Sequence, residues 1–367
     1  MPRMVEHADE YEWRGEGEGA EVVIYAPDEG VADLAFERLS RATRLPGVES
    51  PICVAASPDD LGWAAVSASH AAPDLASVPV RGLLLVADAA TSDLEVRPEE
   101  IPPLISEVRL PRLTAAWTRR ICESGARRAA EEGLIEEEDL PFLDPLAGDA
   151  DALDRRAISA ADRDWHSLES VRACEVGELL NAGAAEGLGL DERAFVLVLS
   201  VGAGELGRFA LAGHRERIAG RVRAGDFGAE EGLPAAPFET GEASDLLSAL
   251  HAAANFADGR AALLLYALRR ALEEFAGALS LLAAWRVGGI EDRGGRLAHR
   301  GNLAVAGEGD VLVSDGSLVA GTGKMFHSVP PFGAPESGGD HPWEEAGLLE
   351  RWVDLGPPGG RASAWTC

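Results

Sequence analysis

The chain has 367 residues, long enough to bury a large core, and 46% hydrophobic with 26% charged residues is typical of a globular protein. Its net charge of −29, with Lys324 as the only lysine, argues against non-specific binding to a phosphate backbone. Such acidity is also typical of salt-adapted proteins. It describes the whole chain and leaves room for a local patch of arginines. Apolar stretches such as 261–268 are too short for a membrane span, and four cysteines without a C-x-x-C pair fit a reducing cytoplasm.

In the first half of the chain, hydrophobic patterning predicts strands at 22–26 and 83–88 and helices at 32–45 and 117–132. Residues 136–164 are acidic and rich in Asp and Ala. This composition predicts a solvated helix-and-loop region and not a catalytic cluster.

The second half begins with a buried strand at 195–200, followed by a helix at 206–222. Further on, the patterning predicts a loop at 225–241, a helical region at 243–285 broken near Asp258-Gly259, strands at 303–305 and 311–313, and a loop at 330–342. The elements together indicate a mixed α/β fold.

Two glycine-rich segments are candidates for phosphate binding. Residues 202–207 match G-x-G-x-x-G between a strand and a helix, but no second apolar strand ending in an acid follows, which favours a simple strand-to-helix turn. Residues 316–325 contain Lys324 but have Leu318 and Met325 where a phosphate loop needs glycine and a hydroxyl. The eight histidines show no compact metal-binding spacing.

Residues 248–260, S-A-L-H-A-A-A-N-F-A-D-G-R, resemble the signature helix of the RtcB family of RNA ligases. Other segments resemble that family in the same order, at 42–47, 167–170, 195–207 and 299–301. The resemblance covers about residues 39–339. It implies one domain over 1–367, with central β-sheets surrounded by helices, an acidic insert at 136–164 and a shortened C-terminal part at 330–367. It also implies GTP- and manganese-dependent RNA ligation, as in RNA repair and tRNA splicing.

The residues that this chemistry requires are replaced. In the resemblance, three metal-binding histidines fall on Ala173, Ser200 and Trp285, and the guanylylated histidine falls near Ser337. The family's metal-binding Asp and Cys are also absent near Arg81. Manganese sites need carboxylate, imidazole or thiolate ligands, and the ligation needs a histidine nucleophile. We therefore expect no catalytic residue, no metal site and no cofactor.

The resulting prediction is a catalytically degenerate RtcB-like protein in the cytoplasm, acting as a binding or scaffolding module for an active paralogue or another protein. A residual nucleotide or phosphate pocket is assigned to Arg172, Asn255, His299, Arg300 and Ser317. RNA binding is not favoured because of the acidic surface.

Two alternatives stay open. A divergent enzyme could use GTP and manganese, with ligands drawn from Asp59, Asp60, Cys174, Glu175, His166 or His327. An unrelated dinucleotide-binding enzyme could use the turn at 202–207.

Overall fold

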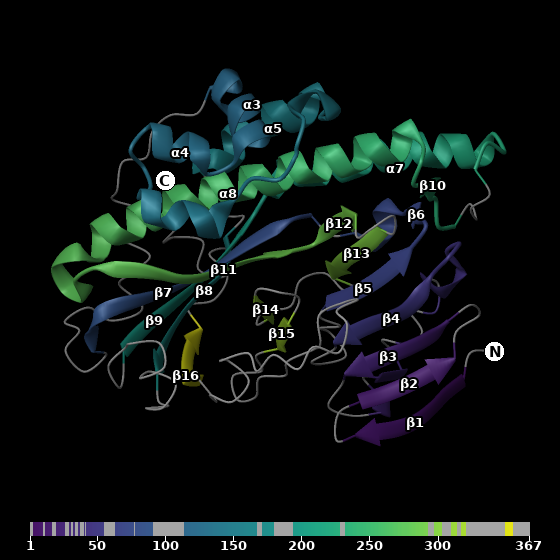
Figure 1. Ribbon diagram of the computed structural model, residues 1–367, viewed down its shortest axis with the longest axis horizontal. Helices are drawn as coiled ribbons and strands as arrows, with labels where there is room; N and C mark the ends of the chain where they lie inside the picture. Colours follow the sequence, from purple (N-terminus) through teal and green to yellow (C-terminus); the bar gives the residue numbers. More distant parts are fainter. Residues whose placement is uncertain are drawn as a thin grey trace.

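Two β-sheets and one long helix, α8, organise the fold (Figure 1). The computed structural model describes residues 3–9, 12–16, 20–25, 29–30, 32–33, 36, 40, 42–54, 63–76, 78–90, 114–166, 171–179, 194–227, 232–292, 297–302, 310–313, 317–320 and 349–354. Over these residues the protein belongs to the mixed α/β class, as predicted. No helix in this part of the chain is long and apolar enough to cross a membrane.

The sheet that lies against α8 has five strands and is antiparallel throughout. Its order is β11 (Leu279–Val287), β7 (Val80–Ala90), β9 (Ala194–Gly202), β8 (Val171–Leu179) and β16 (Leu349–Asp354). The predicted strands at 83–88 and 195–200 are confirmed as β7 and β9. Alternate residues Leu83, Leu85, Leu197 and Leu199 are buried with the apolar side chains of the second half of α8, which explains why these two strands are so apolar.

The second sheet has seven strands, in the order β1 (Arg3–Asp9), β2 (Glu12–Glu16), β3 (Glu21–Tyr25), β4 (Glu49–Val54), β5 (Trp63–Ala68), β13 (Leu297–Asn302) and β12 (Gly289–Asp292). Only the β3–β4 pair is parallel. Two small pairs complete the described strands: β6 (His70–Ala71) with β10 (Ala236–Pro237), and β14 (Asp310–Val313) with β15 (Ser317–Ala320). The strands predicted at 22–26 and 311–313 are confirmed as β3 and β14.

Helix α8 (Gly241–Ala276) is one continuous helix of 36 residues. The predicted break near Asp258-Gly259 is therefore wrong, and the predicted helix beyond 278 is replaced by strand β11. Gly259 is retained in the helix because of close packing, since a Cβ at this position would lie 2.5 Å from Ile121 Cγ2. The helix begins with Thr240, whose side chain accepts a hydrogen bond from the Ala243 amide.

The remaining helices surround α8. Figure 1 shows α3 (Ala115–Ser124), α4 (Arg127–Glu131) and α5 (Arg155–His166) on the side of α8 away from the five-stranded sheet. The predicted helix at 206–222 is confirmed as α7 (Gly204–Arg223), which packs against both α5 and α8. The predicted helix at 117–132 is in fact two helices, because Gly125 has a φ of +56°, outside the helical region.

The acidic region at 136–164 is only partly the solvated segment predicted. It contains the 3₁₀ helices η5 (Glu137–Leu143) and η6 (Ala150–Ala152) and then α5. Within η5, Asp139 is buried and ion-paired with Arg269 of α8, so the assumption that the whole charge run faces water is wrong. The predicted helix at 32–45 lies partly outside the described residues and its described end is the 3₁₀ helix η1 (Ala42–Arg44). Segments 303–305 and 330–342 lie outside the described residues.

Candidate functional site

Three positions that the resemblance assigns to metal ligands lie in one row across the five-stranded sheet. Ala173 of β8 is opposite Ser200 of β9 in the ladder. Ser200 is opposite Gly82 of β7, and Gly82 is opposite Trp285 of β11. Residues from four distant parts of the sequence therefore meet on four neighbouring strands. Directly opposite positions in this row lie close together on one face of the sheet, whereas Ala173 and Trp285 at its two ends are three strand spacings, about 14 Å, apart.

The residue types in this row do not fit manganese. Alanine and glycine have no ligand atom, tryptophan offers only an N–H donor, and a serine hydroxyl is a weak ligand for this ion. Over the described part of the chain, no group of three His, Cys, Asp or Glu side chains could hold a metal ion.

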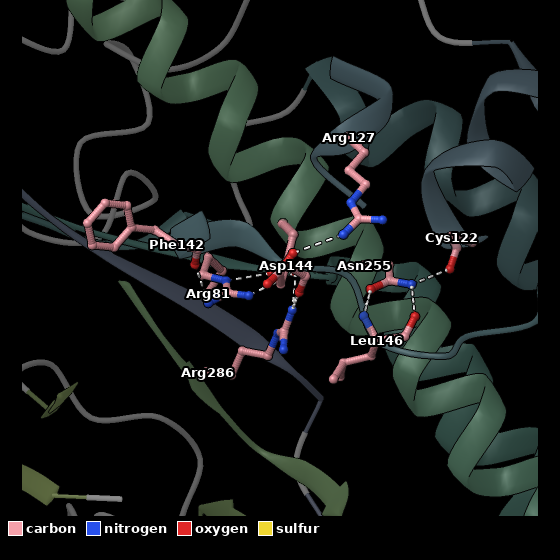
Figure 2. A network of polar contacts seen from close by, with 9 residues as sticks. Arg81, Cys122, Arg127, Phe142, Asp144, Leu146, Asn255 and Arg286 are labelled. Carbon is pink, nitrogen blue, oxygen red and sulfur yellow. Dashed lines mark hydrogen bonds and ion pairs between the residues drawn. The ribbon is translucent and has the colours of Figure 1, made fainter. Parts of the chain in front are cut away.

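The neighbouring row carries a buried cluster of charges (Figure 2). Arg81 of β7 is opposite Arg286 of β11, and both reach Asp258 of α8. Arg81 donates to both carboxylate oxygens, with Nε–Oδ1 2.5 Å and Nη2–Oδ2 2.9 Å, and Arg286 Nη2 donates to Oδ2 at 2.8 Å. Side-chain exposure is 4% for Arg81, 1% for Asp258 and 22% for Arg286. The cluster ties the sheet to the middle of α8.

Two arginines on one carboxylate leave an excess positive charge in this layer. Backbone carbonyls at the end of η5 and in the segment just after it take up part of the remaining donor capacity: Arg81 Nη1 donates to Phe142 O at 3.4 Å, and Arg286 Nη2 also donates to Asp144 O. Arg286 Nε is buried without a hydrogen-bond partner among the described residues. Removal of Asp258 would leave two arginines in this layer without their counter-charge, whereas removal of one arginine leaves Asp258 paired with the other.

Asn255, predicted to contact nucleotide, holds the same segment from the other side (Figure 2). Its Oδ1 accepts from the Leu146 amide at 2.8 Å, and its Nδ2 donates to Leu146 O at 2.9 Å and to Cys122 O at 2.8 Å. The side chain is completely buried. Because both amide hydrogens and the oxygen are engaged with backbone, Asn255 has a structural role in this conformation.

His299 also has a backbone partner. It lies on β13, is completely buried, and its Nε2 accepts a hydrogen bond from the Ala72 amide at 2.9 Å. This contact places the ring proton on Nδ1 of a neutral imidazole. It joins the seven-stranded sheet to the turn before η2 (Pro73–Leu75).

The other three predicted residues are placed by their backbones alone. Arg172 lies at an irregularity of β8, Arg300 follows His299 on β13, and Ser317 begins β15. These strands belong to three different sheets. Asn255 bonds to the backbone of Leu146 and Cys122 and His299 to that of Ala72, and the pocket assigned to the five residues stays a prediction.

The turn at 202–207 is held by a residue that the sequence patterns did not single out. Arg260 of α8 is buried and donates from Nη1 to Gly202 O at 2.8 Å. Gly204 has a φ of +56°, and a Cβ at Gly207 would lie 2.3 Å from Val78 Cγ1. β9 is antiparallel to both of its neighbours, whereas a dinucleotide site is built on parallel strands. The glycines therefore serve the turn and close packing.

The structure describes the side chain of none of the ligands considered for a divergent active enzyme. Asp59, Asp60 and His327 lie outside the described residues. For His166, Cys174 and Glu175 only the backbone is described, on α5 and β8.

Comparison with known proteins adds no relative: no protein-family model matches the chain, and no curated protein matches it.

Proposed function

We propose that this protein is a catalytically degenerate member of the RtcB fold that has kept the scaffold as a binding module. The supporting observation is the row formed by Ala173, Ser200 and Trp285. The resemblance assigns these positions to metal ligands from sequence motifs alone, and the strand register independently makes them neighbours through Gly82. A chance motif match would not be expected to select three positions of one row across four neighbouring strands.

The proposed activity is recognition of a protein partner in the cytoplasm, and an active paralogue of the same fold is the first partner to test. The replaced ligands argue against ligation, because neither a histidine nucleophile nor a metal would be available to form and transfer a nucleotidyl group. The net charge of −29 argues against RNA as the main partner.

The decisive experiment is restoration of two ligands on adjacent strands. The double variant Ala173→His/Ser200→His places two imidazoles on directly opposite positions of β8 and β9, whereas Trp285 lies three strand spacings, about 14 Å, from Ala173. We expect the double variant to bind Co²⁺ or Zn²⁺ more tightly than wild type and the single variant Ser200→His, measured by absorption and by metal analysis. A double variant that folds normally, by circular dichroism, and binds metal no better than Ser200→His would contradict the proposed site.

Loss of chemistry is tested separately on the wild-type chain. Incubation with labelled GTP and Mn²⁺ should leave no label after denaturation, while an active ligase of the RtcB family run in parallel becomes labelled. A labelled band for this protein would overturn the degenerate assignment and support the divergent enzyme.

A further inference from the structure

A second feature lies at the other end of the five-stranded sheet. A groove of about 700 Å³ is bounded by residues 133–142, the last turns of α8 and the first residues of β11. Its apolar lining includes Phe142, Tyr266, Leu279 and Leu281. Phe142 is 38% exposed and is the one large hydrophobic side chain classed as exposed among the described residues.

One wall of the groove is the edge of a sheet. β11 is the outer strand and pairs only with β7 among the described strands. Leu279 O accepts a hydrogen bond from Arg269 Nε at 2.8 Å. This carbonyl therefore points toward the groove and away from β7. In an antiparallel ladder alternate residues direct their backbone groups to the same side. Leu281 therefore shares the orientation of Leu279, ahead of the irregularity that follows it.

Asp139 holds the Arg269 side chain in this position, so its guanidinium does not serve to bind an anionic ligand in the groove. Its guanidinium makes two hydrogen bonds to Asp139, from Nη1 at 2.5 Å and from Nη2 at 3.1 Å. Its side chain is 17% exposed, and that of Asp139 is 5% exposed. The ion pair therefore holds Arg269 so that its Nε–H donates to the edge of β11, in the way that a backbone N–H of an added strand would.

The solvent-facing charges of the groove are mainly negative. Glu136, Glu138 and Glu273 line it and are exposed. Against them stand Arg270, whose guanidinium lies 5.6 Å from the centre of the Tyr266 ring, and Arg269, whose Nη1 lies 3.7 Å from Glu136 Oε2. An acidic rim over an apolar floor complements a ligand with basic and aliphatic side chains, and it repels a nucleic-acid strand.

We propose that the groove binds an extended segment of a partner protein, with alternating Arg or Lys and aliphatic residues, that adds as a strand to the outer edge of β11. Leu281 supplies the backbone hydrogen bonds, since Leu279 O is already bonded to Arg269. The floor at Phe142 and Leu279 takes the aliphatic side chains, and the glutamates bind the basic ones. This inference deepens the proposed binding function, but it does not depend on the loss of metal ligands at the other row.

The test uses the full chain and a labelled nine-residue peptide of alternating valine and arginine, measured by fluorescence anisotropy. We expect saturable binding that weakens about tenfold in Phe142→Ala and in Glu273→Arg, as for central interface residues. Both side chains are exposed, so neither change should disturb folding. The matched control is Glu216→Arg, which makes the same charge change at an exposed position of α7 outside the groove.

Strand addition is separated from simple charge attraction by two further measurements. Proline at the centre of the peptide should abolish binding, because it removes a ladder donor, and hydrogen exchange at residues 279–281 should slow when the valine–arginine peptide binds. Equal weakening in Glu216→Arg, retained binding of the proline peptide, unchanged exchange at 279–281, or absence of binding would each overturn the proposal. None of these outcomes bears on the metal-restoration and guanylylation experiments.

Discussion

Arg81 and Arg286 lie directly opposite each other in the ladder between β7 and β11, and both donate to the carboxylate of Asp258 on α8. Like charges in opposite positions of a ladder destabilise a sheet unless a counter-charge lies between them. Asp258 supplies that charge from the helix. The three residues therefore fix the position of the helix on the sheet, one row away from the row of Ala173, Ser200 and Trp285.

The two arginines should differ in their contribution to stability. We expect Arg81→Met to lower the free energy of unfolding by about 3–5 kcal/mol, because it removes the two-point partner of a buried carboxylate. Arg286→Met should cost about 1–2 kcal/mol, since Asp258 keeps both hydrogen bonds from Arg81. Urea unfolding of the two variants measures the difference. An equal loss in both variants would contradict this division of roles.

Asn255 should behave as a structural residue. Asn255→Leu removes three hydrogen bonds to backbone and leaves buried groups of Leu146 and Cys122 unpaired, so we expect a loss of about 2–4 kcal/mol. Exchange of the Leu146 amide should also become faster. Ser244→Ala, exposed on the same helix, is the control and should change stability by less than about 0.5 kcal/mol. Unchanged stability in Asn255→Leu would favour a role in ligand binding instead.

Two helical glycines should respond in opposite ways to alanine. Gly259→Ala should destabilise the protein by about 1–3 kcal/mol, because the new Cβ would lie 2.5 Å from Ile121 Cγ2. Gly220→Ala on α7 has no neighbour within 4 Å and should stabilise by about 0.5–1 kcal/mol through helix propensity alone. Thermal unfolding of the pair gives the comparison, and stabilisation by Gly259→Ala would show that the contact with Ile121 relaxes freely.

His214 should make stability depend on pH. Burial, and then the charge of Arg217, lower the pKa of this histidine below its ordinary value of 6.5. Because the pKa of His214 is lower in the folded state, the unfolded chain binds the proton more tightly. The contribution of neutral His214 to the free energy of unfolding is therefore complete above pH 6.5 and is lost as the pH falls through the folded-state pKa. His70 has a pKa lowered in the same direction by burial.

Urea midpoints between pH 5 and pH 7.5 test this expectation. The midpoint of the wild-type protein should fall toward the acid side of this range. His214→Gln should reduce the slope, and His70→Gln/His214→Gln should reduce it further. A slope that the two substitutions leave unchanged would assign the pH dependence to other groups.

The regular elements could be predicted where one pattern dominates. β7, β9 and α7 follow from apolar runs and from a helical period bounded by glycines. The end of α8 could not be predicted in this way, because the alanine- and leucine-rich run continues through 279–285, where the chain forms strand β11. An apolar run of this kind is compatible with either structure, and pairing with β7 decides between them.

The buried charges were harder to predict than the strands. Asp139 belongs to an acidic run and Asp258 to an alanine-rich helix, and local sequence gives no sign that each is buried against an arginine from another element. Both pairs depend on tertiary contacts more than 100 residues apart along the chain. Ala173, Ser200 and Trp285, by contrast, each came from a separate sequence motif, and their common row follows only from the strand register.

Helix α8 takes part in three large apolar clusters of the described structure. Its first turns pack with Ile290 and Leu297 of the seven-stranded sheet, its middle with α3, α5 and α7, and its second half with the five-stranded sheet. At 36 residues it is about 54 Å long. Because one continuous helix is shared by all three clusters, we expect that no cluster unfolds without the other two. Heating should therefore produce one cooperative transition, in which the calorimetric and van't Hoff enthalpies agree.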